Sequence, residues 1–167
     1  PYADRNQLLI EVALPEGTHL DLTRERMMQI EGELTLRPEV QQTYSFVGTT
    51  GPRFYYNLPT LPRSPNKGRI VVITETHTQV PALMDWVRDY ATGNMPDTEV
   101  VPRQLGQGPP ITAPVEVRVY SENIAELEQA VEQVYAWVRE APGALDVRHD
   151  LGVGVPSLKF DVNDAVA

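Results

Sequence analysis

The chain begins with a strand pattern, a helix pattern and a second strand pattern. Apolar side chains alternate with other residues over positions 7–14, which predicts a strand with one buried face. The apolar residues that then recur at helical spacing are Met27, Ile30 and Leu34. Thr18 or Asp21 is the expected N-cap of this helix, and Pro38 ends it. Alternation resumes at Val40, so the unit reads strand, helix, strand.

The same order returns over the middle of the chain. Positions 70–73 hold a run of β-branched side chains, which is typical of a strand that is covered on both faces. A helical stripe follows, with Thr78 as the expected cap, and the helix ends near Gly93. Residues 98–101 predict a short strand that completes the second unit.

A third unit is predicted farther along the chain. Valines alternate with charged residues over positions 115–119, which indicates a strand. Asn123 is a good N-cap for the next helix, whose stripe consists of Ile124, Leu127, Val131, Val134 and Val138. A further strand is expected at 145–147 and a last one at 158–162.

These units predict an α+β fold of repeated βαβ elements. Two βαβ units whose strands interleave in antiparallel fashion form the split βαβ, or ferredoxin-like, sandwich, so units one and two suffice for one subdomain. The third unit is half of another, and a lone βαβ unit leaves a sheet edge unpaired. Either the chain is a fragment or a partner supplies the missing half. A single larger sheet that contains all three units is the alternative.

A proline-rich segment separates the first two units. Residues 48–67 contain four prolines, so they can form neither a helix nor a central strand. The aromatic residues 54–56 are costly to leave in water, and Tyr44 and Phe46 lead directly into the segment. One interpretation is an aromatic wall for an apolar ligand, gated by a mobile loop. The other is a surface loop that is pinned by its own aromatic side chains.

Composition and charge exclude several kinds of partner and site. The 167 residues include no cysteine, which rules out disulfides and thiolate metal sites. The formal net charge of −9 argues against nucleic acid or an anionic membrane surface as partner. The histidines lie far apart in the sequence, without the spacing of metal ligands.

The motifs of catalysis are absent from the sequence as well. It contains no P-loop, no dinucleotide-binding fingerprint and no nucleophile elbow. Asp146, His149 and Asp150 resemble parts of an acid–base site, but solvated polar residues at a strand end explain them better. We therefore expect a protein that is not an enzyme and has no cofactor and no metal site.

Two stretches of the sequence resemble one family of transporters. ADRNQLLIEVALPEGTHLDLT resembles the start of the second large periplasmic loop of resistance–nodulation–division (RND) inner-membrane efflux pumps of the hydrophobe/amphiphile type. The stretch from GPPITAPVEVRV through PGALDVR to LKFDVND is similar to the family's next section. The resemblance covers nearly the whole chain.

The resemblance implies a division of the chain. Residues 1–112 would be the first porter subdomain of that loop, residues 113–149 the first half of the second porter subdomain, and residues 150–167 the start of the docking domain. In the family the second half of that porter subdomain follows the docking domain, which explains an odd number of βαβ units. The membrane spans and proton-relay carboxylates would lie outside this chain, leaving a soluble, periplasmic portion of a bacterial inner-membrane protein.

The resemblance also implies a site. In the family, drugs pass through a cleft between the two porter subdomains, and a flexible loop with aromatic residues separates an outer from an inner pocket. Residues 44–51 resemble that switch loop by position. The predicted substrate-binding residues are Tyr44, Phe46, Arg53, Phe54, Tyr55 and Tyr56. The resemblance favours ligand contact over a purely bracing role, although the sequence from Gly51 onward departs from the multidrug members.

The function implied is that of a porter segment in a proton-driven pump for small apolar or amphiphilic compounds. The family implies a homotrimer that works with a periplasmic adaptor and an outer-membrane channel. A heavy-metal pump of the same superfamily is disfavoured, because the segment has no cluster of Met, His or carboxylate groups at ligand spacing. A self-contained ferredoxin-like binding or assembly module, closed as a homodimer, is the alternative from a different class.

Overall fold

The computed structural model describes residues 4–56, 58, 60, 62–106 and 115–151. The helices and strands of these residues are β1 Gln7–Ala13, α1 Leu20–Thr35, β2 Val40–Val47, β3 Lys67–Thr74, the 3-10 helix η1 His77–Gln79, α2 Val80–Asn94, β4 Glu99–Gln104 and α3 Ile124–Glu140. Within the described ranges, no helix is long and apolar enough to span a lipid bilayer.

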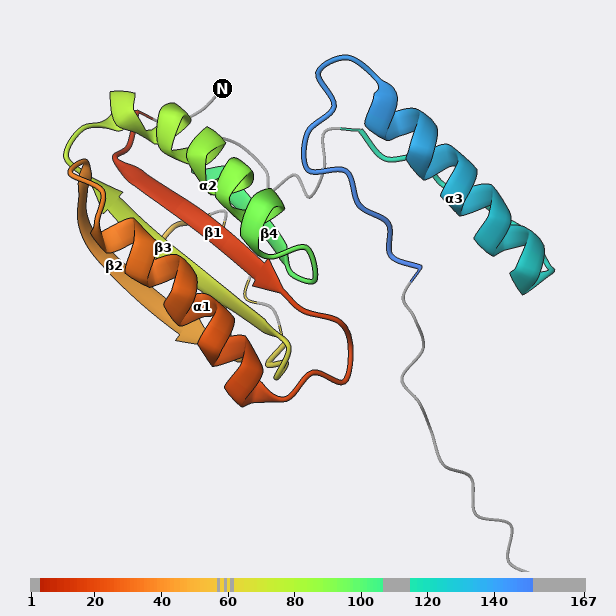
Figure 1. The fold of residues 1–167 in the computed structure, drawn as a ribbon, viewed down its shortest axis with the longest axis horizontal. Helices are drawn as coiled ribbons and strands as arrows, with labels where there is room; N and C mark the ends of the chain where they lie inside the picture. The colour runs from red at the N-terminus through yellow and green to blue at the C-terminus, as the bar shows by residue number, and fades with distance from the viewer. Residues whose placement is uncertain (1–3, 57, 59, 61, 107–114, 152–167) are drawn as a thin grey trace, which may run out of the picture.

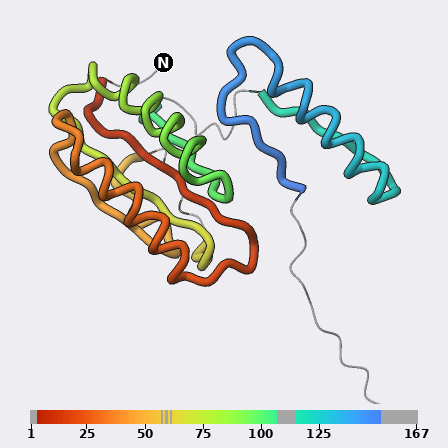
Figure 2. Tube along the Cα trace, viewed as in Figure 1, coloured from red at the N-terminus to blue at the C-terminus, as the bar shows by residue number. Residues whose placement is uncertain are grey.

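The four strands form one antiparallel sheet in the order β2-β3-β1-β4. The helices α1 and α2 lie on the same face of this sheet (Figure 1). This is the split βαβ arrangement, so the α+β, ferredoxin-like prediction is confirmed for the first two units. In the tube view these units form the red-to-green part of the trace, and the cyan-to-blue part lies beside them (Figure 2).

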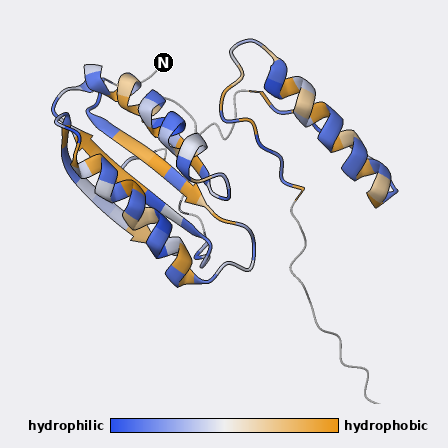
Figure 3. Cartoon of the chain, viewed as in Figure 1, coloured by the Kyte–Doolittle hydropathy of each residue, from blue (hydrophilic) through white to orange (hydrophobic). Residues whose placement is uncertain are grey.

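The main apolar core lies between the sheet and the two helices. Leu8, Ile10 and Val12 of β1 are each at most 2% exposed, and Figure 3 shows their strand as a hydrophobic band between the helices. The helix residues that meet them include Met27, Ile30 and Leu34 of α1 and Val80, Leu83 and Val87 of α2. Each such side chain contributes roughly 1.5–3 kcal/mol when it is fully buried. This packing fixes both helices on one face of the sheet.

The opposite face of the sheet is also covered, which the β-branched run in β3 predicts. Successive side chains of a strand point to opposite faces, so Ile70 and Val72 meet the helices while Arg69 and Val71 point the other way. The apolar cluster on this second face consists of Leu9, Leu58, Val71 and Leu105, with Phe46 and Tyr55 packed against it. Loop residues, rather than a helix, therefore cover this face.

Two helix starts differ from the sequence prediction. His19, not Thr18 or Asp21, is the N-cap of α1, and its Nδ1 accepts a hydrogen bond from the backbone N–H of Asp21 at 3.3 Å. Thr76, not Thr78, begins the turn that leads into α2, and the side chain of Gln79 completes a capping box there. Several polar side chains precede each helix, so the backbone conformation decides which of them becomes the cap. The predicted cap Asn123 is confirmed for α3.

The third unit forms its helix but not its flanking strands. Residues 115–119 and 145–147, predicted as strands, have no ladder partner within the described part of the chain. A strand needs a neighbour for its backbone hydrogen bonds, and the sheet that is present contains only β1 to β4. The single larger sheet is therefore wrong for the described residues. The strand expected at 158–162 lies outside them.

Candidate functional site

The candidate site is built on the loop between β2 and β3, residues 48–66, which we call the β2–β3 loop. Backbone bonds close its base, with Gly48 N–H donating to Lys67 O at 2.8 Å and Ser64 N–H donating to Gly48 O at 3.1 Å. Asn66 connects the loop to the end of β1. Its side-chain amide N–H donates to the backbone carbonyl of Leu14 at 2.8 Å, and its backbone carbonyl accepts from Leu14 N–H at 2.8 Å. The two ends of the loop are thus fixed by the sheet itself.

The six predicted site residues separate into two groups by exposure. Phe46 and Tyr55 are half-buried in the second apolar cluster, and the guanidinium of Arg5 lies 4.9 Å from the centre of the Tyr55 ring. By contrast, Phe54 and Tyr56 are 43% and 57% exposed, although Tyr56 still contacts the Tyr55 ring at 4.8 Å between centroids. The loop therefore uses one pair of aromatic residues to pack against the sheet and presents another pair to solvent.

The two remaining site residues, Tyr44 and Arg53, are also exposed. Tyr44 lies on β2 opposite Val71, on the same side of the sheet as the loop, and its ring is 48% exposed. Its hydroxyl donates to Oε1 of Gln42 at 2.8 Å. Arg53 donates to the carbonyl of Tyr56, so it closes a turn within the loop. The structure thus places Tyr44, Phe46 and Tyr55 on the sheet face opposite the helices.

A buried arginine ties the loop to three strands. Arg69 of β3 is 2% exposed, and its guanidinium donates to the carbonyl of Thr50 at 3.2 Å and to Oε1 of Glu11 on β1 at 3.2 Å. The other carboxylate oxygen of Glu11 forms an ion pair with Arg103 of β4 at 3.1 Å. A buried guanidinium is stable only when it is paired and hydrogen-bonded. The loop carbonyl of Thr50 supplies one of the hydrogen bonds that Arg69 needs, so burial of Arg69 fixes the loop at this point.

Gly51 permits a close approach between the loop and β2. Its φ of 70° lies in the left-handed region, and an added Cβ would lie 2.7 Å from the Phe46 ring. A side chain at this position would therefore be strained and would displace the ring. The conformation of residues 48–51 and the buried position of Phe46 depend on each other.

The titratable residues of the described part of the chain were candidates for a metal or acid–base site. No group of three or more His, Cys, Asp or Glu side chains there could hold a metal ion. Asp146 pairs with Arg88, while His149 lies 3.9 Å from Glu132 and packs edge-on against Tyr135. Asp146 and His149 thus contact different neighbours, Arg88 in one case and Glu132 and Tyr135 in the other.

The sequence analysis did not predict the charged cluster of Glu11, Arg69 and Arg103 beneath the loop. The alternation over positions 7–14 predicts one buried face, and Glu11 lies on the other face together with Leu9. The signal that could have revealed the cluster is the occurrence of Arg69 and Glu11 on strands whose other side chains are almost all apolar. A charge in such a strand has to find a partner from a neighbouring strand.

The fold and the charged loop anchor define a ferredoxin-like subdomain that carries an aromatic surface loop. The chain belongs to the AcrB/AcrD/AcrF family, because the model of that family matches residues 1–167. This supports the RND resemblance of the sequence, although the hydrophobe/amphiphile type is not distinguished by the match.

Among individual proteins, the chain is similar to two metal-resistance proteins. It is 28% identical over 171 residues to the nickel and cobalt resistance protein CnrA of Cupriavidus metallidurans, covering 94% of this chain and 15% of that protein. It is 25% identical over 173 residues to the nickel-cobalt-cadmium resistance protein NccA of Alcaligenes xylosoxydans xylosoxydans, again covering 15% of the relative. The chain thus spans about one seventh of the length of these relatives.

Solved structures of a heavy metal efflux pump share the fold. One crystal form superposes with a TM-score of 0.70 at 21% identity, and another with a TM-score of 0.72 at 19% identity. Both comparisons cover 99% of this chain and 18% of the pump chain. The likeness therefore extends over the ferredoxin-like subdomain and the residues that follow it.

Proposed function

We propose that the chain is part of the periplasmic porter region of a proton-driven RND efflux pump in a bacterial inner membrane. The observation that carries the proposal is the family match over all 167 residues. In this proposal the porter region binds and releases a substrate without converting it chemically, and the pump works as a homotrimer with an adaptor and an outer-membrane channel. The family match also favours a pump segment over the self-contained homodimeric module.

A small amphiphilic compound is the first candidate substrate. It is supported by the exposed side chains of Tyr44, Phe54 and Tyr56, which offer apolar ring surface and two hydroxyl groups to solvent. A porter must hold its cargo weakly enough to release it, and a partly exposed aromatic surface suits such binding.

A divalent metal cation is the second candidate substrate. It is favoured by the comparisons, because CnrA and NccA are named for resistance to nickel and cobalt and the solved pump is described as a heavy metal efflux pump. The similarity to these proteins supports a metal pump, although the sequence of this segment shows no ligand cluster. In a porter, the ligands of the cargo need not all come from one segment.

Expression of the full-length pump with its adaptor, in a bacterial strain without its own efflux pumps, tests the proposal. Growth is measured against a panel of cationic and neutral amphiphiles and, in parallel, against nickel, cobalt and cadmium salts. Increased tolerance to amphiphiles alone supports the first substrate, and increased tolerance to metals alone supports the second. Unchanged tolerance to both panels, with the pump present in the membrane at normal level, would contradict the efflux function.

A further inference from the structure

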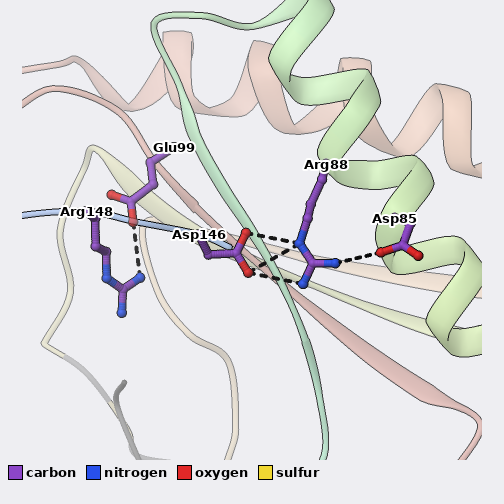
Figure 4. A network of polar contacts seen from close by, with 5 residues as sticks. All are labelled: Asp85, Arg88, Glu99, Asp146 and Arg148. Carbon is purple, nitrogen blue, oxygen red and sulfur yellow. Dashed lines mark hydrogen bonds and ion pairs between the residues drawn. The ribbon is translucent and has the colours of Figure 1, made fainter. Parts of the chain in front are cut away.

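Two charged residues after α3 contact the ferredoxin-like subdomain (Figure 4). The carboxylate of Asp146 accepts hydrogen bonds from Nε of Arg88 at 3.1 and 3.3 Å and from Nη2 at 3.1 Å. Two residues farther on, Nη1 of Arg148 donates to Oε1 of Glu99 at 3.1 Å. Arg88 lies on α2 and Glu99 begins β4, so one short segment is held at two points.

The charges at these two points alternate in sign on both sides. The subdomain presents a cation at Arg88 and an anion at Glu99, while the segment presents an anion at Asp146 and a cation at Arg148. A shift of the segment by two residues would place like charges together, which penalises the wrong register. The arrangement therefore specifies one relative position of the two parts.

In the Arg88–Asp146 contact, the position of each side chain is also set by its own surroundings. Arg88 also donates to Asp85 of the same helix at 3.0 Å, which fixes the guanidinium on the surface of α2. Asp146 adopts a φ of 53°, a left-handed conformation that aspartate tolerates better than most residues. The side chains of Arg88 and Asp146 are only 19% and 23% exposed, so the ion pair is partly shielded from water.

The contact lies outside the two apolar clusters of the described residues. Both apolar clusters found in the described residues consist of residues up to Leu105, and none of 115–151 joins them. Ionic contacts at partly exposed sites are individually weak, whereas apolar interfaces hold domains together permanently. Such a contact can open and close without disrupting either buried apolar cluster.

We infer that α2 and β4 form a docking surface for residues 146–148 of the same chain, and that this docking is a reversible ionic latch. We name the latch by its four residues, Arg88, Asp146, Glu99 and Arg148. The latch sets the position of residues 115–151, which we call the α3 unit, against the ferredoxin-like subdomain. The opening of the latch during transport rests on the proposed efflux function. The existence of the latch does not depend on that function.

Distance measurements between spin labels test the latch without reference to transport. Cysteines replace Asp89 on α2 and Glu128 on α3, both exposed, in a full-length pump without other cysteines, and this chain contributes none. Arg88→Asp should shift or broaden the distance distribution, and the added change Asp146→Arg should restore it. The control Arg118→Asp removes a local pair with Glu116 and should leave the distribution unchanged. An unchanged distribution in Arg88→Asp, or no recovery in the charge swap, would overturn the latch.

Crosslinking tests whether the latch opens. Cysteines replace Asp89 and Leu145, which are exposed neighbours of two latch residues, so that the latch itself stays intact. A reducible crosslinker between them should abolish transport, and reduction should restore it. The control pair replaces Arg24 and Met28, which are exposed on α1, and its crosslink should leave transport intact. Normal transport by the crosslinked 89–145 pump would show that the contact is static and would overturn the opening. A pump that moves no substrate before crosslinking would instead contradict the proposed function, and the distance measurement would still decide the latch.

Discussion

Arg69 shows how one buried charge couples a loop to a sheet. Its guanidinium is almost fully enclosed, yet it reaches both Glu11 on β1 and the carbonyl of Thr50 in the β2–β3 loop. Glu11 in turn pairs with Arg103 on β4, so a single carboxylate connects two arginines. Because removal of one member leaves the others incompletely paired, the cluster resists change at any of its positions.

Replacement of Arg69 is expected to loosen the loop. Arg69→Met keeps the apolar stem but leaves the Thr50 carbonyl and one Glu11 oxygen without their donor, which should lower the free energy of unfolding by about 1–3 kcal/mol. Urea unfolding of the chain measures the loss, and hydrogen exchange should accelerate at residues 50–56. Arg69→Lys, which keeps the charge, should lose less. Equal exchange rates in the Met variant and the unchanged chain would contradict the anchor.

Gly68 of β3 lies directly beneath Met27 of α1, with no room for a side chain between them. A Cβ at this position would lie 2.2 Å from Sδ of Met27 and 2.8 Å from the carbonyl oxygen of Phe46, so Gly68→Ala should destabilise the fold by about 1–3 kcal/mol. The matched control is Gly32→Ala within α1, where no atom lies within 4 Å of the added Cβ. That change should stabilise the helix by roughly 0.5–1 kcal/mol. Thermal unfolding of both variants by circular dichroism measures the difference, and two changes of the same sign would contradict the packing described.

Individual side chains were the least predictable level from sequence. The exposure of Phe54 and Tyr56 and the half-burial of Phe46 and Tyr55 could not be read from their types, because all four are aromatic. They differ because Phe46 and Tyr55 pack against the apolar cluster on the second face of the sheet, whereas Phe54 and Tyr56 are exposed. The caps His19 and Thr76 were missed for a related reason, since each competes with a neighbouring polar residue.

At the scale of elements, an ion pair connects α1 to the turn before β4. Arg26 donates to Asp97 at 2.9 Å, and this hydrogen bond, opposed by partial burial and supported by Thr98, lowers the pKa of Asp97 below its ordinary value of 3.8. A carboxylate with a lowered pKa stabilises the fold above its ordinary pKa and loses that contribution as the pH falls. The contact therefore contributes at neutral pH and disappears in acid.

Asp97→Asn should reveal this pH dependence. The variant is expected to be less stable than the unchanged chain near neutral pH, and the gap should narrow as the pH falls from about 6 to about 3. Urea unfolding at a series of pH values measures the gap. Asp89→Asn, at an exposed position of α2, is the control and should show a flatter difference. A gap that widens toward low pH would contradict the assigned partner.

Helices and the strands of the first two units were predictable because their patterns are local. The stripe of Met27, Ile30 and Leu34 packs as expected, and the β-branched run at 70–73 lies in a strand that is covered on both faces. The strands predicted at 115–119 and 145–147 were wrong for a physical reason. Alternation signals that a segment fits a sheet, but a strand forms only where a neighbour supplies its hydrogen bonds.

At the scale of the whole molecule, the chain consists of a complete ferredoxin-like subdomain and an α3 unit beside it (Figure 1). The apolar stripe of α3 is at best half-buried, and Ile124 and Trp137 are 71% and 67% exposed. Predicted as half of a second porter subdomain, this unit would be completed by other residues of a longer protein. The proposed latch then supplies the connection that an apolar core does not.

The location of the candidate site was partly predictable. The proline-rich segment identified the β2–β3 loop, and the resemblance pointed to Tyr44 and Phe46 at its start. The sequence could not show that the loop crosses the sheet face opposite the helices, because this depends on Arg69 and Leu58 rather than on the loop's own pattern. The substrate class likewise depends on surfaces beyond a single segment.

The most direct test of the account is the transport of a fluorescent amphiphile by the full-length pump with altered aromatic residues. Phe54→Ala and Tyr56→Ala should change which compounds are exported while the amount of pump in the membrane stays normal. Leu36→Ala, at an apolar position that is 77% exposed at the end of α1, is the control and should change neither. An unchanged substrate profile together with a reduced amount of pump would contradict the account and assign these two rings to the fold alone.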